Sequence, residues 1–235
     1  MNATLAPTGE LRVAVYAGGP TSMVRKAGAA EPVGIAYELG RELARELGVP
    51  VRLVELPGGG QRLTDALKAG EADFTFTNAS DARARDVDFT VPLLRLELGY
   101  LVPADSRIGS FDEVDRPGVK IGVSQGSTSQ TELPRLLKAA TVVPAPSTDA
   151  AAQQLREHGL DAFATNKSLL FELSAKVPGA RVLDGRWGVE NLAIAVPKGR
   201  EAARPWLQGF AEKMRSSGEL QKMIERAGVR GAARD

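Results

Sequence analysis

The sequence predicts an α/β protein built of two lobes, and three observations support this prediction. The 235 residues are 43% hydrophobic and 25% charged, a composition typical of a folded chain with a core. Strand-like stretches alternate with helix-like stretches in βαβα order, which favours a parallel sheet covered by helices. The same α/β pattern then occurs a second time along the chain, and two copies indicate two lobes.

The first copy starts at residues 11–16, which alternate like a strand and run into the turn signal Gly18-Gly19-Pro20. Apolar residues then recur with helical spacing from residue 35 to residue 47, and Gly48 ends that helix. Residues 51–56, 62–69 and 72–77 follow as a predicted strand, helix and strand.

The second copy starts near residue 119 with a strand over residues 120–124. A helix opens after Gly126, and residues 142–144, 149–158 and 160–165 are predicted as strand, helix and strand. The tail from residue 202 to residue 227 is predicted to be helical, with an apolar face of Trp206, Phe210 and Met214 that packs on the first lobe.

Each copy ends its last strand in a Thr-Asn pair, which contains Asn78 in the first copy and Asn166 in the second. In open α/β sheets, ligands bind beyond the carboxyl ends of the strands. We therefore expect Asn78, Asn166 and the loops after residues 15 and 123 to face one shared cleft. The alternative is that both asparagines are ordinary turn residues.

Further polar candidates lie beside these strand ends. Ser80 suits the N-cap of a short helix, and Arg83 in its first turn offers the planar fork that suits a carboxylate. Ser127 and Thr128 open a helix whose N-terminus favours an anion. Tyr16 ends a strand and is a pocket candidate. The alternatives are that Arg83 is a solvated surface residue, that Ser127 and Thr128 are common helix caps, and that Tyr16 packs at the hinge.

Composition argues against several classes of function. The 30 basic and 29 acidic residues give a net charge of +1, so nothing indicates a nucleic-acid or anionic-membrane partner. The chain has no cysteine and a single histidine, His158. These counts argue against a thiolate nucleophile, a Ser-His-Asp triad and a metal site, and no cofactor is expected. Residues 1–8 are polar, which leaves open a cytosolic chain or a mature chain whose signal peptide was removed.

The order and spacing of five segments resemble the bacterial extracellular solute-binding proteins of family 3, and the resemblance extends from residue 9 to the final helices. The segments are Val33-Gly34-Ile35 with Glu38-Leu39, Gly70-Glu71-Ala72-Asp73, Arg83 with Val87-Asp88-Phe89-Thr90-Val91-Pro92, Ile121-Gly122-Val123-Ser124-Gln125-Gly126-Ser127-Thr128, and Leu192-Ala193-Ile194-Ala195-Val196-Pro197-Lys198-Gly199. The resemblance implies a type II periplasmic-binding-protein fold. Lobe 1 would comprise residues 1–101 completed by 194–235, and lobe 2 residues 102–193. A two-strand hinge near residues 98–102 and 191–196 would join them.

This resemblance also implies a function. The protein would be a periplasmic, monomeric component of an ABC importer that is not an enzyme. It would capture an amino acid or a related organic acid by hinge closure and then dock on a permease. Arg83 would pair with the ligand carboxylate, Thr128 would support that carboxylate, and Asn78 would hydrogen-bond the ligand from lobe 1.

One departure from the family pattern bears on the ligand. Asn166 occupies the position at which the family usually has an aspartate that holds the ligand ammonium. A buried ammonium without a carboxylate partner is costly. An acid without an amine is therefore favoured, unless Glu190 or Glu172 supplies the negative charge.

Two other functions stay open at this point. Some proteins of this fold are cyclohexadienyl dehydratases, in which a cleft carboxyl acts as general acid, and Glu190 or Glu172 would take that role. The other possibility is a ligand-sensing module separated from a receptor. The absence of turnover on prephenate or arogenate would count against the dehydratase.

Overall fold

The computed structural model describes residues 1–57 and 59–233, and it divides into two compact units. Unit 1 comprises Met1–Arg95 and Asn191–Val229, and unit 2 comprises Leu96–Glu190 and the segment that begins at Arg230. The predicted boundaries were instead 101/102 and 193/194, with residues 194–235 in lobe 1. The last two residues of that range lie outside the described part of the chain.

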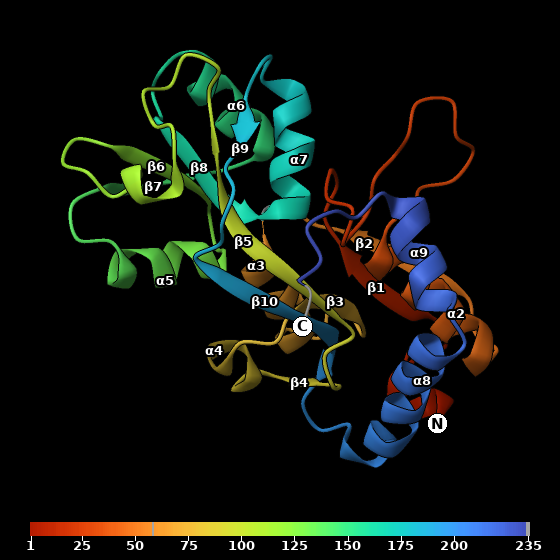
Figure 1. Cartoon of the computed structure of the whole chain (residues 1–235). Helices are drawn as coiled ribbons and strands as arrows, with labels where there is room; N and C mark the ends of the chain where they lie inside the picture. The colour runs from red at the N-terminus through yellow and green to blue at the C-terminus, as the bar shows by residue number, and fades with distance from the viewer. Residues whose placement is uncertain (58, 234–235) are drawn as a thin grey trace. The chain divides into compact units, whose positions relative to one another are not determined.

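Unit 1 contains two blocks of sequence, one that precedes Leu96–Glu190 along the chain and one that follows it (Figure 1). Its N-terminal block comprises α1 Asn2–Leu5, β1 Leu11–Val15, α2 Ile35–Leu47, β2 Val51–Glu55, α3 Gly60–Lys68, β3 Thr75–Asn78, α4 Asp81–Ala84 and β4 Val87–Phe89. Its C-terminal block comprises the 3₁₀ turn η2 Glu201–Ala203, α8 Arg204–Ser216 and α9 Glu219–Ala227.

The strands β1, β2 and β3 of unit 1 run in the same direction. Val13 pairs in parallel with Leu53 on β2 and forms a parallel bridge with Phe74, just before β3. The carboxyl ends of the three strands therefore lie at one edge. On its other side β3 pairs antiparallel with β10 Gly188–Pro197, in the register Leu192 to Asn78.

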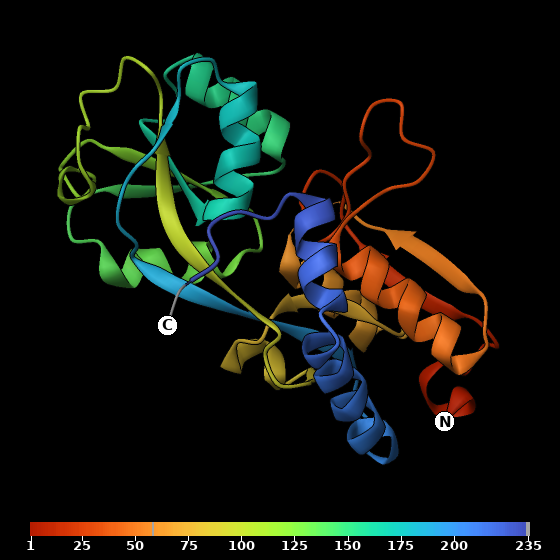
Figure 2. The same ribbon diagram turned by 45° about the vertical axis from the view of Figure 1, so that its right-hand side comes forward.

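The C-terminal tail of unit 1 forms two helices rather than the single predicted one. Gly218, with φ +79°, separates α8 from α9, because only glycine adopts this left-handed conformation without strain. Figure 2 shows α9 beside α2, and an ion pair between Arg226 and Glu38 joins these helices. Phe210 and Met214 are buried as predicted, and Trp206 stacks on Phe210 at a ring distance of 6.1 Å.

Unit 2 is the second α/β layer. Its elements are the 3₁₀ turn η1 Phe111–Glu113, β6 Lys120–Ser124, α5 Thr128–Leu136, β7 Thr141–Ala145, α6 Thr148–Arg156, β8 Ala162–Asn166, α7 Lys167–Lys176 and β9 Arg181–Val182. The central strand β6 pairs in parallel with both β7 and β8. Ala162 and Ala164 face the core that includes Leu133 of α5, whereas Phe163 faces the core with α6 and α7.

The internal repeat is visible in matching hydrogen bonds. In unit 1 the backbone N–H of Arg12 donates to the Asp73 carboxylate at 3.1 Å, and the Asp73 N–H donates to the Arg12 carbonyl. In unit 2 Lys120 and Asp161 make the same two bonds, with the carboxylate at 2.8 Å. The shared aspartate thus ties the start of the first strand to the last strand in each copy.

The boundaries differ from the predicted ones because β5 Leu94–Val102 and β10 each contribute to both units. In β5, residues from Leu98 onward pair with β8, whereas residues of β10 from Leu192 onward pair with β3. The end of the chain joins unit 2 because the Arg230 guanidinium lies 4.1 Å from the Phe171 ring centroid.

Candidate functional site

Three of the predicted residues of unit 1 lie at the end of β3 or just after it. Asn78 is the last residue of that strand, Ser80 is the N-cap of α4, and Arg83 lies within α4. The Ser80 hydroxyl accepts a hydrogen bond from the Arg83 N–H at 3.4 Å, the contact expected of an N-cap. The sequence thus predicts this short helix and its cap correctly, and the cap orients the turn that carries Arg83.

Arg83 is buried, with 6% of its surface exposed. Its Nη1 donates to the Thr77 hydroxyl and to the Asn78 carbonyl, each at 3.3 Å. A buried guanidinium is stable only where acceptors replace water, and β3 supplies these two. The interpretation of Arg83 as a solvated surface residue is therefore wrong, and the side chain has a defined orientation at the strand edge.

Asn78 has a structural role that the sequence only suggests. Its Oδ1 accepts a hydrogen bond from the Asn191 N–H at 3.0 Å, and the Ala79 N–H donates to the Asn191 carbonyl at 2.8 Å. These bonds continue the β3–β10 ladder past the end of the strand. The side chain therefore secures the strand end beside Arg83.

Tyr16 follows β1 at the same edge of unit 1. Its backbone N–H donates to the Ser22 hydroxyl at 2.8 Å, and its own hydroxyl lies 3.3 Å from that of Thr21. Gly19 lies under the tyrosine ring, because a methyl group at Gly19 would lie 2.5 Å from ring atom Cε2. The ring thus orders the loop that follows β1.

In unit 2, Ser127 and Thr128 start α5 at the carboxyl end of β6. The Ser127 hydroxyl caps the helix by accepting from the Gln130 N–H at 3.3 Å, as the sequence predicts. The Gln130 side chain in turn accepts from the Gly126 N–H at 2.7 Å. Thr128 is the first residue of the helix, where backbone N–H groups favour a negative charge.

Asn166 ends β8 at the same edge of unit 2, and it contacts an acid. Its Oδ1 accepts from the Leu169 N–H at 3.0 Å and so caps α7. Its Nδ2 donates to Glu190 Oε2 at 3.1 Å. Both side chains are buried, with 8% of each residue exposed. The position at which the resemblance implies an aspartate therefore has a carboxylate next to it, supplied by a residue 24 positions later.

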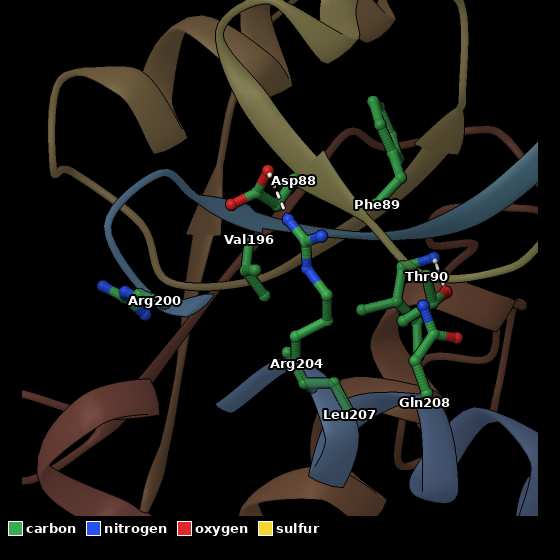
Figure 3. Close-up of a pocket in the computed structure, with 9 residues that line it drawn as sticks. Asp88, Phe89, Thr90, Val196, Arg200, Arg204, Leu207 and Gln208 are labelled. Carbon is green, nitrogen blue, oxygen red and sulfur yellow. Dashed lines mark hydrogen bonds and ion pairs between the residues drawn. The ribbon is translucent and has the colours of Figure 1, made fainter. Parts of the chain in front are cut away.

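Two cavities among the described residues of unit 1 do not resemble a metabolite site. The one in Figure 3 lies between β4, β10 and α8, with Arg204 directed toward Asp88. Its space is about 10 Å³, roughly that of one water molecule. A depression of about 380 Å³ near α2 and α9 is lined by charges that pair with each other, such as Glu42 with Arg45.

The described residues lack a metal-binding cluster and a membrane-spanning helix. No group of three or more His, Cys, Asp or Glu residues among them is arranged to hold a metal ion. No helix in that part of the chain is long and apolar enough to cross a bilayer.

The model of one protein family matches residues 11–228 of the chain, and that family is the bacterial extracellular solute-binding proteins, family 3. The chain belongs to this family. The matched range includes the strand ends of both units and therefore every sequence-predicted site residue from Tyr16 to Glu190.

One curated relative is a probable histidine-binding protein of Neisseria gonorrhoeae, which is 28% identical to this chain. The alignment covers 68% of this chain and 62% of the relative, so the chain spans less than two thirds of that protein.

Several solved structures with a similar fold are binding components of ABC transporters. One is the substrate-binding protein AbpA of an amino acid ABC transporter from Streptococcus pneumoniae bound to L-arginine, with 22% identity, 95% and 96% coverage of the two chains and a TM-score of 0.82. A putative ABC transporter binding component from Wolinella succinogenes complexed with lysine has 23% identity, 93% and 95% coverage and a TM-score of 0.81. The fold is thus the predicted type II periplasmic-binding-protein fold.

A third neighbour bears on the enzyme alternative. The ancestral amino acid-binding protein AncCDT-1, a precursor of cyclohexadienyl dehydratase, has 25% identity, 94% and 96% coverage and a TM-score of 0.80. AncCDT-1 is named as a binding protein, like the relatives above.

Three residues of this solute-binding protein were missed or left open by the sequence. Thr77 is buried and contacts Arg83; it belongs to the Thr-Asn pair at the strand end, but the sequence pattern indicates only its neighbour Asn78 as a site candidate. Gly60 lies against the same arginine. Trp187 packs on the core of unit 2 and donates from Nε1 to the Gly99 carbonyl at 3.2 Å, a contact that no local pattern indicates.

Proposed function

We propose that this protein is the substrate-binding component of an amino-acid ABC importer, and that its ligand is an α-amino acid. Membership of solute-binding family 3 supports the transport role. The hydrogen bond between Asn166 and Glu190 carries the proposal for the ligand, because it brings a carboxylate to the position where the sequence lacks one.

The ligand carboxylate binds Arg83. The guanidinium is buried at the strand edge of unit 1 and is oriented by the Thr77 hydroxyl and the Asn78 carbonyl. A planar guanidinium forms two parallel hydrogen bonds with a carboxylate, which makes this pair strong and directional. Ser127 and Thr128 of unit 2 add the N-terminus of α5, whose partial positive charge favours the same anionic group.

The ligand ammonium binds Glu190. Asn166 already uses Oδ1 to cap α7 and directs its amide N–H toward the Glu190 carboxylate. A buried carboxylate is stabilised by cations and hydrogen-bond donors, and an α-ammonium provides both. Asn166 thus acts as a positioning residue, and Glu190 takes the place of the usual aspartate. On this basis the preference for an amine-free acid, inferred from the sequence, is abandoned.

The choice of probe ligands follows from the relatives. The names of the curated and structural relatives mention histidine, arginine and lysine, which are amino acids with basic side chains. We therefore take L-arginine as the probe. Its analogue 5-guanidinopentanoate lacks the α-amine, and agmatine lacks the carboxylate. The three compounds separate recognition of the two ends of the amino acid.

Calorimetric titration of the three compounds tests the proposal. L-Arginine, or in its place L-histidine or L-lysine, is expected to bind, whereas both truncated analogues lose about 10- to 100-fold or more in affinity, because each leaves a buried charge without its partner. Equal binding of arginine and 5-guanidinopentanoate would contradict the assignment of Glu190. Failure of all three amino acids, with tight binding of an amine-free acid, would overturn the ligand class.

Two glutamate variants assign the ammonium partner. Glu190→Gln is expected to remove the preference for the amine, because the amide carries no negative charge. Glu172→Gln is the matched control, since Glu172 lies in α7 of the same unit, and no hydrogen bond among the described residues joins it to Asn166. A loss of amine preference in Glu172→Gln alone would transfer the role to Glu172.

In this proposal the protein is a periplasmic monomer that closes around the ligand by hinge motion and then docks on a membrane permease. X-ray scattering with and without L-arginine tests closure through a smaller radius of gyration in the liganded state. Light scattering tests the monomer. Reconstitution with the permease of an amino-acid ABC importer tests docking through stimulated ATP hydrolysis.

The enzyme alternative has one observation in its favour, the buried Glu190 beside Asn166. A buried carboxyl is the kind of group that acts as general acid toward a leaving hydroxyl. Incubation with prephenate and arogenate tests it directly, and binding without turnover is expected. Turnover abolished by Glu190→Gln would replace the transport proposal.

A further inference from the structure

Gly60, the first residue of α3, lies against the guanidinium of Arg83. A methyl group built on Gly60 would lie 2.6 Å from Arg83 Nη2 and 2.8 Å from Arg83 Cζ. It would also lie 2.7 Å from the Thr77 hydroxyl. These separations are shorter than van der Waals contact, so the space that a side chain at position 60 would need is already occupied by the arginine.

The backbone of Gly60 does not explain the glycine. Gly60 is not among the residues with positive φ, and it lies in the first turn of a helix. Alanine is the better helix former by about 1 kcal/mol in a helix interior. Helix propensity therefore gives no reason for a glycine at position 60, and the reason has to lie in the residues around it.

A side chain at position 60 would meet both Arg83 and Thr77. The guanidinium is the far end of a long flexible side chain, whereas Thr77 is β-branched and buried in β3, so its χ1 rotamer is restricted. The arginine therefore moves away, and the first residue of α3 shifts slightly to relieve the 2.7 Å contact with the Thr77 hydroxyl. In moving, the guanidinium leaves its hydrogen bonds to the Thr77 hydroxyl and the Asn78 carbonyl.

We propose that Gly60 is a positioning residue for ligand binding, because its missing side chain makes the space in which the Arg83 guanidinium is held. The inference rests on the proposed role of Arg83 as the partner of the ligand carboxylate. It adds that the residue at position 60 controls how strongly the ligand carboxylate is bound, while the fold stays the same.

Gly60→Ala and Gly209→Ala form a matched pair of variants for the test. Gly209 also lies in a helix of unit 1, α8, and a methyl group there would meet nothing within 4 Å. Each substitution adds one methyl group to a helix of unit 1, at the first residue of α3 or in the interior of α8. Only the substitution at position 60 meets a guanidinium, so any difference between the two variants reports on Arg83.

The first measurement is affinity, by calorimetry with L-arginine and with agmatine, which lacks the carboxylate. Gly60→Ala is expected to bind L-arginine about tenfold more weakly or worse, because a carboxylate–guanidinium pair is strong only in the aligned geometry. Its affinity for agmatine is expected to match that of Gly209→Ala, whereas its thermal midpoint is expected to be a few degrees lower, because the displaced guanidinium loses two buried hydrogen-bond acceptors. A general structural defect would instead weaken the binding of L-arginine and of agmatine alike.

The second measurement needs no ligand. Crystal structures of the wild type and of Gly60→Ala are expected to differ in the Arg83 side chain. In the variant the guanidinium is expected to lie away from Thr77 and to have lost its hydrogen bond to the Thr77 hydroxyl. An unmoved guanidinium in Gly60→Ala would overturn the inference. The inference would also be overturned if Gly60→Ala bound L-arginine as tightly as the wild type while Arg83→Ala bound none. That result would leave the proposed function intact. If the wild type binds no amino acid, the function fails, and the crystal structures still decide the role of Gly60.

Discussion

Arg200 donates a hydrogen bond from Nη2 to Asp73 Oδ1 at 2.7 Å, across 127 positions of sequence. The Asp73 side chain is completely buried, and its other oxygen accepts from Arg12 Nε at 2.8 Å. Arg200 also donates to the Leu5 carbonyl at 2.9 Å. One carboxylate thus joins the N-terminal strand, the third strand and the C-terminal segment of unit 1.

Asp73→Asn is expected to lower the free energy of unfolding by about 3–5 kcal/mol, because two partly buried guanidinium groups lose their shared negative charge. Urea denaturation measures this loss. Asp86→Asn is the matched control, since Asp86 pairs with the exposed Lys68 at the surface and such pairs contribute about 1 kcal/mol or less. Equal losses in the two variants would contradict the special role of Asp73.

The same carboxylate predicts a pH dependence of stability. Burial by itself raises the pKa of Asp73, but hydrogen bonds from Arg12 and Arg200 outweigh it and leave the pKa below its ordinary value. A pKa that is lower in the folded state stabilises the protein fully above the unfolded value of about 4. This stabilisation is then lost as the pH falls through the lower folded-state pKa. Urea midpoints from pH 7 to pH 2 are expected to fall less steeply in Asp73→Asn than in the wild type.

Gly231→Ala is expected to destabilise unit 2. Gly231 has φ +77°, its carbonyl accepts from the Glu97 N–H at 2.9 Å, and a methyl group there would overlap Cβ of Lys167. The variant would combine backbone strain with overpacking and lose about 2–4 kcal/mol. Gly118→Ala has a similar φ of +84° with open space around it, so it carries the strain alone. Thermal unfolding of both variants, together with hydrogen exchange at Glu97, separates the two contributions.

Ser127→Ala and Ser147→Ala separate capping from ligand binding. Ser127 and Ser147 cap α5 and α6 by accepting from the N–H groups of Gln130 and Ala150. Each substitution is expected to lower the free energy of unfolding by about 1 kcal/mol. Of these two serines, only Ser127 belongs to the proposed ligand site, so only Ser127→Ala is expected to weaken L-arginine binding. Equal affinities in the two variants would remove Ser127 from the site.

The residues Asn78 and Asn166 show how far the sequence pattern reaches. Both end a strand, as the repeat predicts, because the alternation of the strand and the Thr-Asn pair are local signals. Their partners were not predictable in the same way. Asn78 secures Asn191 and Asn166 contacts Glu190, and these contacts depend on where β10 returns to each unit.

The boundaries of the units illustrate the same limit. Residues 98–102 and 191–196 were predicted as connecting strands, and both lie within β5 and β10. Where each strand changes its unit depends on its pairing with β8 or β3, and pairing between distant strands leaves no local pattern. The attachment of the chain end to unit 2 was missed for the same reason.

The sequence by itself determined the α/β order, the repeat, the strand ends that carry polar residues and the family, because periodicity, caps and motif spacing are written in neighbouring residues. Only the tertiary structure decided that Glu190 stands beside Asn166, that Gly60 makes room for Arg83 and that Asp73 joins Arg200. Hydrogen bonds and steric contacts between distant segments arise only when the chain has folded, so no local pattern encodes them.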